Sequence, residues 1–400
     1  MLNAYIYDGI RTPIGRHGGA LAPMRPDDLL ALCIRHLVER NAFDPNTIED
    51  VVIGCTNQAG EDARNVARHA GLVAGVPIGA GGITVNRLCG SGLAAILDAG
   101  RAAHAGQGDL FVAGGTESMS RAPFVMAKAE AAYSRNLVTF DSTIGARFPN
   151  PRLEAEFGDD TMPRTADNVA EHMDVSREAA DRFAAWSQSK YQAARDAGFY
   201  TDELLPVDVP QGRKKPPLTV AEDEHPRAGT SVESLAGLRT LFPGGVVTAG
   251  NASGVNDGAG AMLVGTLEAG ERAGIKPRAR IISGAIAGVE PRLMGLGPVP
   301  ATKKALQRAG LSLEQMDVIE LNEAFASQVL GCTRSLGMAD DDPRLNPNGG
   351  AVAIGHPLGA SGARLVLTAM RELERRQGRY ALVTMCIGVG QGIAAVIERQ

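Results

Sequence analysis

Short apolar runs rich in valine and isoleucine alternate with alanine-rich stretches of helical spacing in two parts of the chain. This alternation favours a mostly parallel α/β sheet in each part. The first part predicts strands at 1–8, 50–54, 82–86 and 109–115 and helices at 63–74 and 92–104. The second part predicts strands at 279–287, 318–321, 379–386 and 391–398, a glycine-bounded strand just before His356, and helices at 300–309, 323–336 and 361–376.

A segment of different character separates the two parts. Residues 121–245 are rich in charge, proline and loop residues, and only residues 176–197 predict a convincing amphipathic helix. Residues 207–230 have no clear periodicity. Because the segment has apolar positions of its own, among them Phe183 and Trp186, we interpret it as an inserted subdomain and not as a linker.

The two parts also repeat each other at an offset of 270 residues. Each copy begins with Ser-Gly, continues through a predicted helix, and reaches Gln-Gly before a predicted strand. The matching residues are Ser91, Gly92, Leu97, Ala99, Arg101, Gln107 and Gly108 in the first copy and Ser361, Gly362, Leu367, Ala369, Arg371, Gln377 and Gly378 in the second. This predicts two similar halves whose loops face one shared cleft.

Composition narrows the class of protein. A formal net charge of −5 over 400 residues argues against a general nucleic-acid binder, and no apolar run approaches the length of a membrane span. The chain opens as a strand, without the regions of a signal peptide, so we expect a cytoplasmic location. No Cys-x-x-Cys pair occurs among the five cysteines, so neither a disulfide framework nor a metal site is expected.

One cysteine lies where a predicted strand ends and a helix begins. Cys89 is in the run Asn86–Gly92, at the predicted N-terminus of the helix. Unpaired N–H groups and the helix dipole at such a position favour a thiolate and lower the pKa of the thiol. Cys89 is therefore a candidate nucleophile, and the alternative is a buried structural cysteine at a tight turn.

Three further side chains lie at glycine-framed ends of predicted elements. His356 precedes a helix, much as Cys89 does in the first half, and can act as the base for that thiol. Cys386 can act as an acid or base, and the glycine turn after it has N–H groups that can form an oxyanion hole. Asn322 can orient a water or polarise a carbonyl. The alternatives are a turn-capping histidine, a buried strand-end cysteine and an N-cap asparagine.

These residues lie in six motifs that resemble those of the thiolase family, in the family's order and across essentially the whole chain. The motifs are Asn86–Gly92, Gly114–Ser120, Gly250–Ala259, Asn322–Phe325, Gly355–Pro357 and Cys386–Gly392. The resemblance implies an α/β fold of two similar βαβαβαββ halves in αβαβα layers, with an inserted loop domain. The implied parts are an N-terminal half of 1–120 plus 246–275, an inserted domain of 121–245 for CoA binding and oligomerisation, and a C-terminal half of 276–400.

The resemblance also implies CoA-dependent cleavage of a 3-oxoacyl-CoA, with coenzyme A as cosubstrate and no permanently bound cofactor. Cys89 is then the acylated nucleophile, and His356 takes its proton. Cys386 protonates the departing enolate and later deprotonates the incoming CoA. One oxyanion hole consists of the N–H groups of Cys89 and Gly388, and the other of His356 and a water held by Asn322.

Further positions in the motifs are implied to bind the substrates. Ser253 is the implied contact for pantetheine, and Arg227 and Ser234 are the implied contacts on the adenine side of CoA. Arg147 or Arg164 can pair with a distal carboxylate, because a guanidinium suits bidentate carboxylate binding. The alternative for both arginines is a solvated surface.

Within the family, Asp141–Arg147, Met162-Pro163 and Asp340–Arg344 resemble the thiolases that cleave 3-oxoadipyl-CoA to succinyl-CoA and acetyl-CoA. Two other functions stay open. One is a broad-range 3-oxoacyl-CoA thiolase of fatty-acid β-oxidation, and the other is a non-catalytic lipid carrier of similar fold. The resemblance implies a homo-oligomer, either a dimer or a tetramer, and no nucleic-acid or membrane partner is expected.

Overall fold

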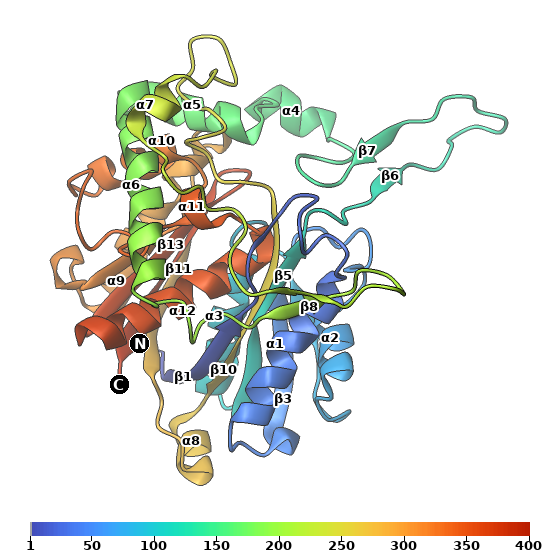
Figure 1. The fold of residues 1–400 in the computed structure, drawn as a ribbon, viewed down its shortest axis with the longest axis vertical. Coiled ribbons are helices and arrows are strands. Elements are labelled where there is room, and N and C mark those ends of the chain that lie inside the picture. Colours follow the sequence, from blue (N-terminus) through green and yellow to red (C-terminus); the bar gives the residue numbers. More distant parts are fainter. Residues whose placement is uncertain (1) are drawn as a thin grey trace.

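The computed structural model describes residues 2–400, in which ten strands form one central sheet (Figure 1). The strands are β1 (Ala4–Arg11), β2 (Gly15–Arg16), β3 (Ile48–Gly54), β4 (Ile83–Val85), β5 (Leu110–Ser118), β10 (Asn256–Gly265), β11 (Ala279–Gly288), β12 (Val318–Leu321), β13 (Tyr380–Ile387) and β14 (Gln391–Arg399). Their order is β12-β13-β14-β11-β1-β10-β5-β3-β4, and β2 pairs with β10.

Helices cover the sheet, and four of them lie in the segment between β5 and β10. The helices are α1 (Pro26–Arg40), α2 (Val66–Ala74), α3 (Ser91–His104), α4 (Pro151–Phe157), α5 (Met162–His172), α6 (Arg177–Asp196), α7 (Val232–Ala236), α8 (Leu267–Ala273), α9 (Pro298–Ala309), α10 (Ala326–Ser335), α11 (Ala351–Ile354) and α12 (Leu358–Arg376). A 3₁₀ segment, η2 (Pro291–Leu296), precedes α9.

The two ends of the sheet are built alike. From the centre outward the first half reads β1, β10, β5 and β3, and the second reads β11, β14, β13 and β12. β1 pairs with β11 in antiparallel orientation, while β3–β5 and β12–β13 are parallel pairs. The offset of 270 residues that superposes α3 on α12 also superposes β5 on β13. The sequence repeat is therefore a structural repeat.

Three helical layers alternate with the two halves of the sheet. α3 and α12 pack together between them, where Leu93 and Leu365 share one buried cluster with Phe111 of β5 and Met385 of β13. A second cluster joins α1 and α2 to the first half, and a third joins α9 and α10 to the second half. The αβαβα order expected from the resemblance is confirmed.

The Ser-Gly pair of the repeat allows α3 and α12 to approach closely. A Cβ atom on Gly362 would lie 2.2 Å from the backbone nitrogen of Leu93, and one on Gly92 would lie 2.5 Å from the carbonyl oxygen of Gly359. Only glycine fits where two backbones come so close. The glycines thus explain why the starts of both helices, and the loops before them, meet at one place.

Between β5 and β10 the chain leaves the sheet. This segment contains α4 to α7 and two hairpins, formed by β6 (Phe124–Met126) with β7 (Thr139–Asp141) and by β8 (Val207–Val209) with β9 (Leu218–Val220). Figure 1 shows β6 and β7 on an arm that extends away from the body of the molecule. The helix predicted at 176–197 is α6, and the other helices of this segment had no clear sequence signal.

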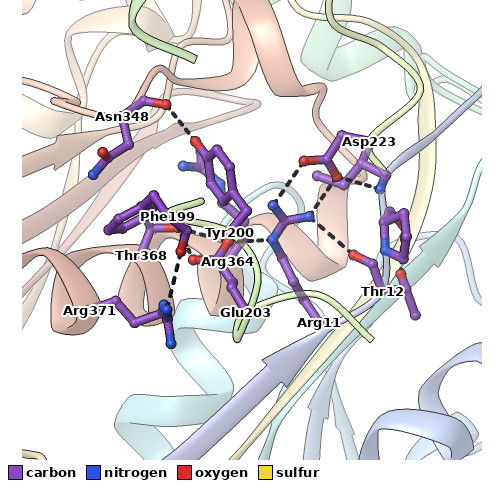
Figure 2. A network of polar contacts seen from close by, with 12 residues as sticks. Arg11, Thr12, Phe199, Tyr200, Glu203, Asp223, Asn348, Arg364, Thr368 and Arg371 are labelled. Atoms are coloured by element: carbon purple, nitrogen blue, oxygen red, sulfur yellow. Dashed lines mark hydrogen bonds and ion pairs between the residues drawn. The ribbon is translucent and has the colours of Figure 1, made fainter. Parts of the chain in front are cut away.

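A buried ion-pair network ties this segment to the first strand (Figure 2). The guanidinium of Arg11 donates through Nε to Glu203 at 2.5 Å, and through Nη1 and Nη2 to Asp223 at 2.7 and 3.0 Å. Thr368 of α12 also donates to Glu203. The Arg11 side chain is 2% exposed and both carboxylates are fully buried. Since Arg11 is on β1 and Thr368 is on α12, the network joins the segment between β5 and β10, here called the insert, to both halves of the molecule.

One predicted element is wrong and several boundaries move. The glycine-bounded strand expected before His356 is the short helix α11, because Glu323 accepts a hydrogen bond from Val352 N–H and favours a helical start there. The helix predicted from residue 63 begins at Val66, and the one predicted from 361 begins at Leu358. The strand predicted from Met1 is observed from Ala4, and Met1 itself lies outside the described residues.

Candidate active site

Cys89 lies on a tight loop between β4 and α3. Leu88, just before it, has φ of +47°, a left-handed conformation that costs energy for a side chain of this size. The hydroxyl of Ser91 holds the loop: it accepts from Arg87 N–H at 2.9 Å and donates to Leu88 O at 2.6 Å. As predicted, Cys89 directly precedes the N-terminus of a helix, and its side chain is half-buried.

The hairpin between β13 and β14 lies against this loop. Cys386 is at the end of β13, fully inside the protein, and the turn that follows contains Gly388. A Cβ atom on Gly388 would be 3.3 Å from Cδ1 of Leu88, so the turn packs directly on the nucleophile loop. The predicted β-hairpin is confirmed, and its turn lies against the loop that carries the candidate nucleophile.

The Cys89 thiol differs from the prediction in its protonation. Burial raises the pKa of Cys89 to about 11, although hydrogen bonds from the N–H groups of Gly388 and Cys89 itself lower it. The expected lowering by the helix N-terminus is therefore outweighed by the loss of solvation. Burial and the neighbouring Cys89 also raise the pKa of Cys386 well above that of a free thiol. Both groups are thiols, and not thiolates, near neutral pH.

The hydrogen bonds of His356 define its tautomer. Nδ1 is 2.6 Å from Oγ of Ser361, and that hydroxyl is 2.8 Å from the carbonyl oxygen of Pro357, which can only accept. Since the Ser361 proton goes to Pro357, we assign the proton of the imidazole to Nδ1. Nε2 then carries the lone pair, and it accepts a hydrogen bond from Nδ2 of Asn322 at 3.3 Å.

His356 is neutral at physiological pH. Burial, with a smaller contribution from the nearby Arg364 charge, lowers the pKa of His356 to about 3. A neutral imidazole with its lone pair on Nε2 can accept a proton from a thiol. The site thus contains a protonated candidate nucleophile and an unprotonated candidate base.

Asn322 lies at the end of β12, fully buried. Its N–H donates to Thr384 O on β13 at 3.0 Å, which places it two residues from Cys386 in the neighbouring strand. The alternative of an N-cap is wrong, because α10 begins only at Ala326 and its N-cap position is Phe325. Phe325 shares an apolar cluster with Cys386, so the strand end and the second thiol belong to one site.

Two residues of the first half hold the histidine loop of the second half. Oδ1 of Asn256, on β10, accepts from the backbone N–H of His356 at 2.9 Å. Oε2 of Glu117, on β5, accepts from the N–H of Gly359 at 2.8 Å. Sequence analysis placed both residues in motifs but gave them no role. The signals available in the sequence were a carboxylate and an amide side chain close to glycines in two of the motifs.

A buried cluster near Glu117 has the composition of a metal site. Ligand atoms of Cys55, Asp62 and Glu117 lie within 4.8 Å of one another. However, the two carboxylate oxygens of Glu117 accept from the backbone N–H groups of Thr56 and Asn57 as well as Gly359. Burial also raises the pKa of Cys55 well above its usual value, so that thiol is a hydrogen-bond donor. Hydrogen bonding accounts for this cluster.

The residues expected to contact CoA lie in the segment leading to β10. Ser253 donates its N–H to Ala324 O at 3.0 Å, so it lies beside the Asn322 loop. Arg227 is exposed and lines a hollow of about 410 Å³ with Gln188 of α6. Ser234 is exposed on α7, where its hydroxyl completes a capping box with Ser231.

The two arginines proposed for a distal carboxylate lie on different elements. Arg164 is exposed on α5, two residues after Met162, and its guanidinium carbon is 5.5 Å from the ring centroid of Phe242. Met162 approaches the Gly388 turn, since a Cβ atom on that glycine would be 3.7 Å from its sulfur. Arg147 is half-buried near the β6–β7 arm and donates to Ser142 O at 3.0 Å.

Comparison with known proteins agrees with this fold and this set of residues. The chain matches the thiolase N-terminal domain over residues 4–268 and the thiolase C-terminal domain over residues 275–399. It therefore belongs to the thiolase family of acyltransferases. No helix within residues 2–400 is long and apolar enough to cross a membrane.

Individual relatives span the whole chain. It is 58% identical over 401 residues to the 3-oxoadipyl-CoA/3-oxo-5,6-dehydrosuberyl-CoA thiolase of Escherichia coli K12. It is 57% identical over 401 residues to a β-ketoadipyl-CoA thiolase of Acinetobacter baylyi. Each alignment covers 100% of both chains. Among solved structures, human mitochondrial 3-ketoacyl-CoA thiolase in complex with CoA has a TM-score of 0.91 at 38% identity, covering 100% of this chain and 98% of that one.

Proposed function

We propose that the protein cleaves 3-oxoadipyl-CoA with CoA to give succinyl-CoA and acetyl-CoA, through an acyl group on Cys89. The observation that carries this proposal is the close approach of the starts of α3 and α12, which follow the Cys89 and His356 loops, together with the packing of the Gly388 turn after Cys386 on the Cys89 loop. The relatives that act on 3-oxoadipyl-CoA, at 57–58% identity over the full length, support the choice of substrate. The CoA complex of the human relative supports CoA as the cosubstrate.

In the first step, the Cys89 sulfur attacks the 3-oxo carbon and its proton passes to Nε2 of His356. The bond between C2 and C3 then breaks, and its electron pair forms the enolate of acetyl-CoA. Cys386, whose raised pKa keeps it protonated, donates a proton to C2, and acetyl-CoA leaves. The N–H groups of Cys89 and Gly388 stabilise the oxyanion on the acyl carbon, while His356 and a water held by Asn322 stabilise the enolate oxygen.

In the second step, the Cys386 thiolate takes the proton of the incoming CoA thiol. The CoA sulfur attacks the acyl carbon on Cys89, the bond to Cys89 breaks, and succinyl-CoA forms. The proton held by His356 returns to the Cys89 sulfur. One thioester replaces another, so the exchange has little thermodynamic cost, and the oxyanion donors lower its barrier.

We propose that the chain has three parts: an N-terminal half of 1–120 plus 246–275, an inserted domain of 121–245, and a C-terminal half of 276–400. We propose that the inserted domain and the loop before β10 bind CoA. The Ser253 loop, hydrogen-bonded beside Asn322, is suited to the pantetheine end. Arg227 and Ser234 come earlier in the chain, in the inserted domain. Both are exposed, as contacts to the adenine side of CoA require.

For the distal carboxylate of the substrate we favour Arg164 over Arg147. Neither arginine forms an ion pair among residues 2–400, but Arg147 donates to Ser142 O, whereas Arg164 is on the helix whose Met162 approaches the Gly388 turn. We expect Arg164→Met to raise KM for 3-oxoadipyl-CoA with little change for acetoacetyl-CoA, and Arg147→Met to change neither. Equal effects of Arg164→Met on both substrates would reject this assignment.

The proposal is tested by thiolysis of 3-oxoadipyl-CoA beside acetoacetyl-CoA and an unbranched medium-chain 3-oxoacyl-CoA. We expect a strong preference for the dicarboxylate, and no turnover or acyl-enzyme by mass spectrometry in Cys89→Ala. Cys33→Ala, which removes a buried thiol of α1, is the matched control and should keep its activity. Full turnover in Cys89→Ala would exclude the covalent mechanism and leave a role as a carrier.

A broad-range 3-oxoacyl-CoA thiolase of fatty-acid oxidation is the second candidate. The human 3-ketoacyl-CoA thiolase, with its TM-score of 0.91, favours it. Equal or better turnover of the neutral chains than of 3-oxoadipyl-CoA would select this function instead.

We also propose a homo-oligomer, a dimer or a tetramer, in the cytoplasm. The edge strand β4 exposes 49% of Ile83, and the arm exposes the whole of Tyr133 and 70% of Leu137. Exposed strand edges and apolar arms are protected by association. A reducing compartment would keep the Cys89 thiol free. Light scattering of the purified chain tests the assembly, and a monomer at all concentrations would reject it.

A further inference from the structure

Glu117 joins the two halves of the molecule at the candidate active site. It lies near the end of β5 and is 1% exposed. Its oxygens accept three hydrogen bonds from backbone N–H groups: Oε1 from Asn57 at 3.0 Å, and Oε2 from Thr56 at 3.0 Å and Gly359 at 2.8 Å. Thr56 and Asn57 follow β3 of the first half. Gly359 is in the first turn of α12 of the second half, three residues after His356.

Thr56 continues this contact to the loop that carries the nucleophile. Its hydroxyl donates to Leu88 O at 3.1 Å, and its carbonyl oxygen accepts from Nδ2 of Asn86 at 3.0 Å. Leu88 has the left-handed φ of +47°, a conformation that persists only where surrounding contacts hold it. Hydrogen bonds therefore run without a gap from the Cys89 loop, through Thr56 and Glu117, to the start of α12.

The backbones around this carboxyl group are packed in direct contact. A Cβ atom on Gly359 would lie 2.5 Å from the carbonyl oxygen of Thr116, and one on Gly54 would lie 2.3 Å from the backbone nitrogen of Gly92. The ends of β5 and β3 thus lie against the starts of α12 and α3, the helices that follow the two loops. Close-packed interiors transmit displacement, so a shift at this point would move both loops.

The contacts of Glu117 require a carboxyl group but not its charge. Glu117 pairs with no cation among residues 2–400. Burial raises the pKa of Glu117, the three N–H groups lower it, and the charge of Asp62 adds a smaller rise. Both oxygens keep lone pairs in either protonation state, and only a carboxyl side chain offers two acceptor oxygens at one point. The group therefore suits the three N–H groups that converge on it.

We propose that Glu117 is a positioning residue that fixes the Cys89 loop relative to the His356 loop. The path of the proton from Sγ of Cys89 to Nε2 of His356 then keeps its length and direction. The proposal rests on the proposed function, in which these two residues are the nucleophile and the base. Glu117 acts through Thr56 and Gly359 and needs no contact with the substrate.

The first test compares Glu117→Met and Glu117→Gln in the full chain. Methionine is of similar length but has no oxygen, so all three N–H groups lose their acceptor. Glutamine has a single acceptor oxygen with two lone pairs, so at least one N–H group is left without a partner. We expect kcat to fall about 100-fold in Glu117→Met and about 10-fold in Glu117→Gln, with KM for CoA unchanged, because the reacting groups are displaced and the CoA contacts are not.

A double variant tests the path through Thr56. Thr56→Val removes the hydroxyl that bonds Leu88 O and keeps the backbone N–H that bonds Glu117. If both residues act on the same loop, their effects on kcat should not add in Glu117→Met/Thr56→Val. Full additivity of the two losses would contradict this path and overturn the proposal.

Asp317→Leu is the matched control. Oδ2 of Asp317 also accepts from backbone N–H groups, those of Arg379 at 2.7 Å and Tyr380 at 3.0 Å. These contacts join β12 to β13 just before β12 begins, at the opposite end of the strand from Asn322. Asp317→Leu should lose stability in urea denaturation without a change in kcat.

A second readout does not need enzymatic activity. Amide hydrogen exchange, followed by mass spectrometry, should become faster in Glu117→Met at residues 86–89 and 356–359 and stay unchanged elsewhere in the sheet. If Glu117→Met does not fold, Glu117→Gln replaces it and should show faster exchange in the same two segments. An unaltered protein without thiolase activity would reject the proposed function alone. Exchange that rises everywhere, or that stays unchanged in either segment, would overturn the role of Glu117.

Discussion

At the scale of single residues, the environment of each functional group decides its protonation. The Cys89 thiol has two N–H groups against it, but burial dominates and holds its pKa at about 11. His356 has its pKa lowered to about 3 by burial and by Arg364. The resting pair is therefore a thiol and a neutral imidazole. This state differs from the thiolate that the helix N-terminus alone would favour.

This state predicts how Cys89 reacts with iodoacetamide, which alkylates only the thiolate. Because the pKa is raised to about 11, alkylation should rise about tenfold per pH unit between about pH 7 and 10, without a plateau. Peptide mapping by mass spectrometry measures the rate at Cys89, and the fully buried Cys332 should stay unlabelled. A rate already at its plateau near pH 7 would indicate a preformed ion pair instead.

At the scale of elements, the site depends on the contact between α3 and α12. Each helix follows a loop that carries a functional residue, and the Ser-Gly pair of the repeat opens α3 and lies at the fourth and fifth residues of α12. The serines act alike: Ser91 bonds the loop that carries Cys89, and Ser361 bonds the imidazole of His356. The glycines bring the two helix starts together. The internal repeat thus builds one site from two equivalent loops.

Gly362→Ala should disrupt this contact. The added Cβ atom would lie 2.2 Å from the backbone nitrogen of Leu93. That nitrogen cannot move unless α3 shifts. We expect a loss of stability of about 1–3 kcal/mol or more, with a large loss of activity, from chemical denaturation and thiolysis assays. Gly100→Ala on α3 is the control, because its Cβ atom would meet only side chains, the nearest being Cδ1 of Ile281 at 3.2 Å. Equal losses in both variants would argue against a special role of this contact.

At the scale of the whole molecule, the insert is held to both halves by the Arg11 network (Figure 2). Asp223 also accepts from Ile14 N–H at 2.8 Å, and Tyr191 of α6 donates to it at 3.3 Å. The chain returns from here through Arg227 and Ser253 to β10. The position of the proposed CoA contacts therefore depends on the buried charges of Arg11, Glu203 and Asp223 beside β1.

Arg11→Met should destabilise the protein strongly. It leaves Glu203 and Asp223 buried without their cation, and breaking such a pair costs about 3–5 kcal/mol. Arg16→Met is the control: Arg16 is 55% exposed and pairs with Glu224, so less than about 1 kcal/mol should be lost. Urea denaturation measures both. If the two variants lose similar stability, the network does not hold the insert in place.

Local pattern was enough for much of the fold and for the candidate residues. Alternating apolar runs predicted most strands of the sheet, and the repeat predicted the two halves, because burial of a strand or helix face leaves a periodic trace in the sequence. Glycines at the ends of predicted elements also pointed to the candidate residues, since such glycines can be recognised in the local sequence. These residues are Cys89, His356, Cys386 and Asn322. The strand expected before His356 failed, since a short apolar run has no period that separates strand from helix.

Contacts between distant segments decided the rest. The direction of the Cys89 pKa shift depends on how deeply the second half buries the thiol, and no local motif records that burial. The tautomer of His356 depends on the rotation of Ser361, and its loop is held by Asn256 and Glu117 from the other half. Desolvation and hydrogen bonding act through space between groups far apart in the chain. The residue types of the site are therefore readable from sequence, whereas their protonation and geometry arise only when the two halves pack.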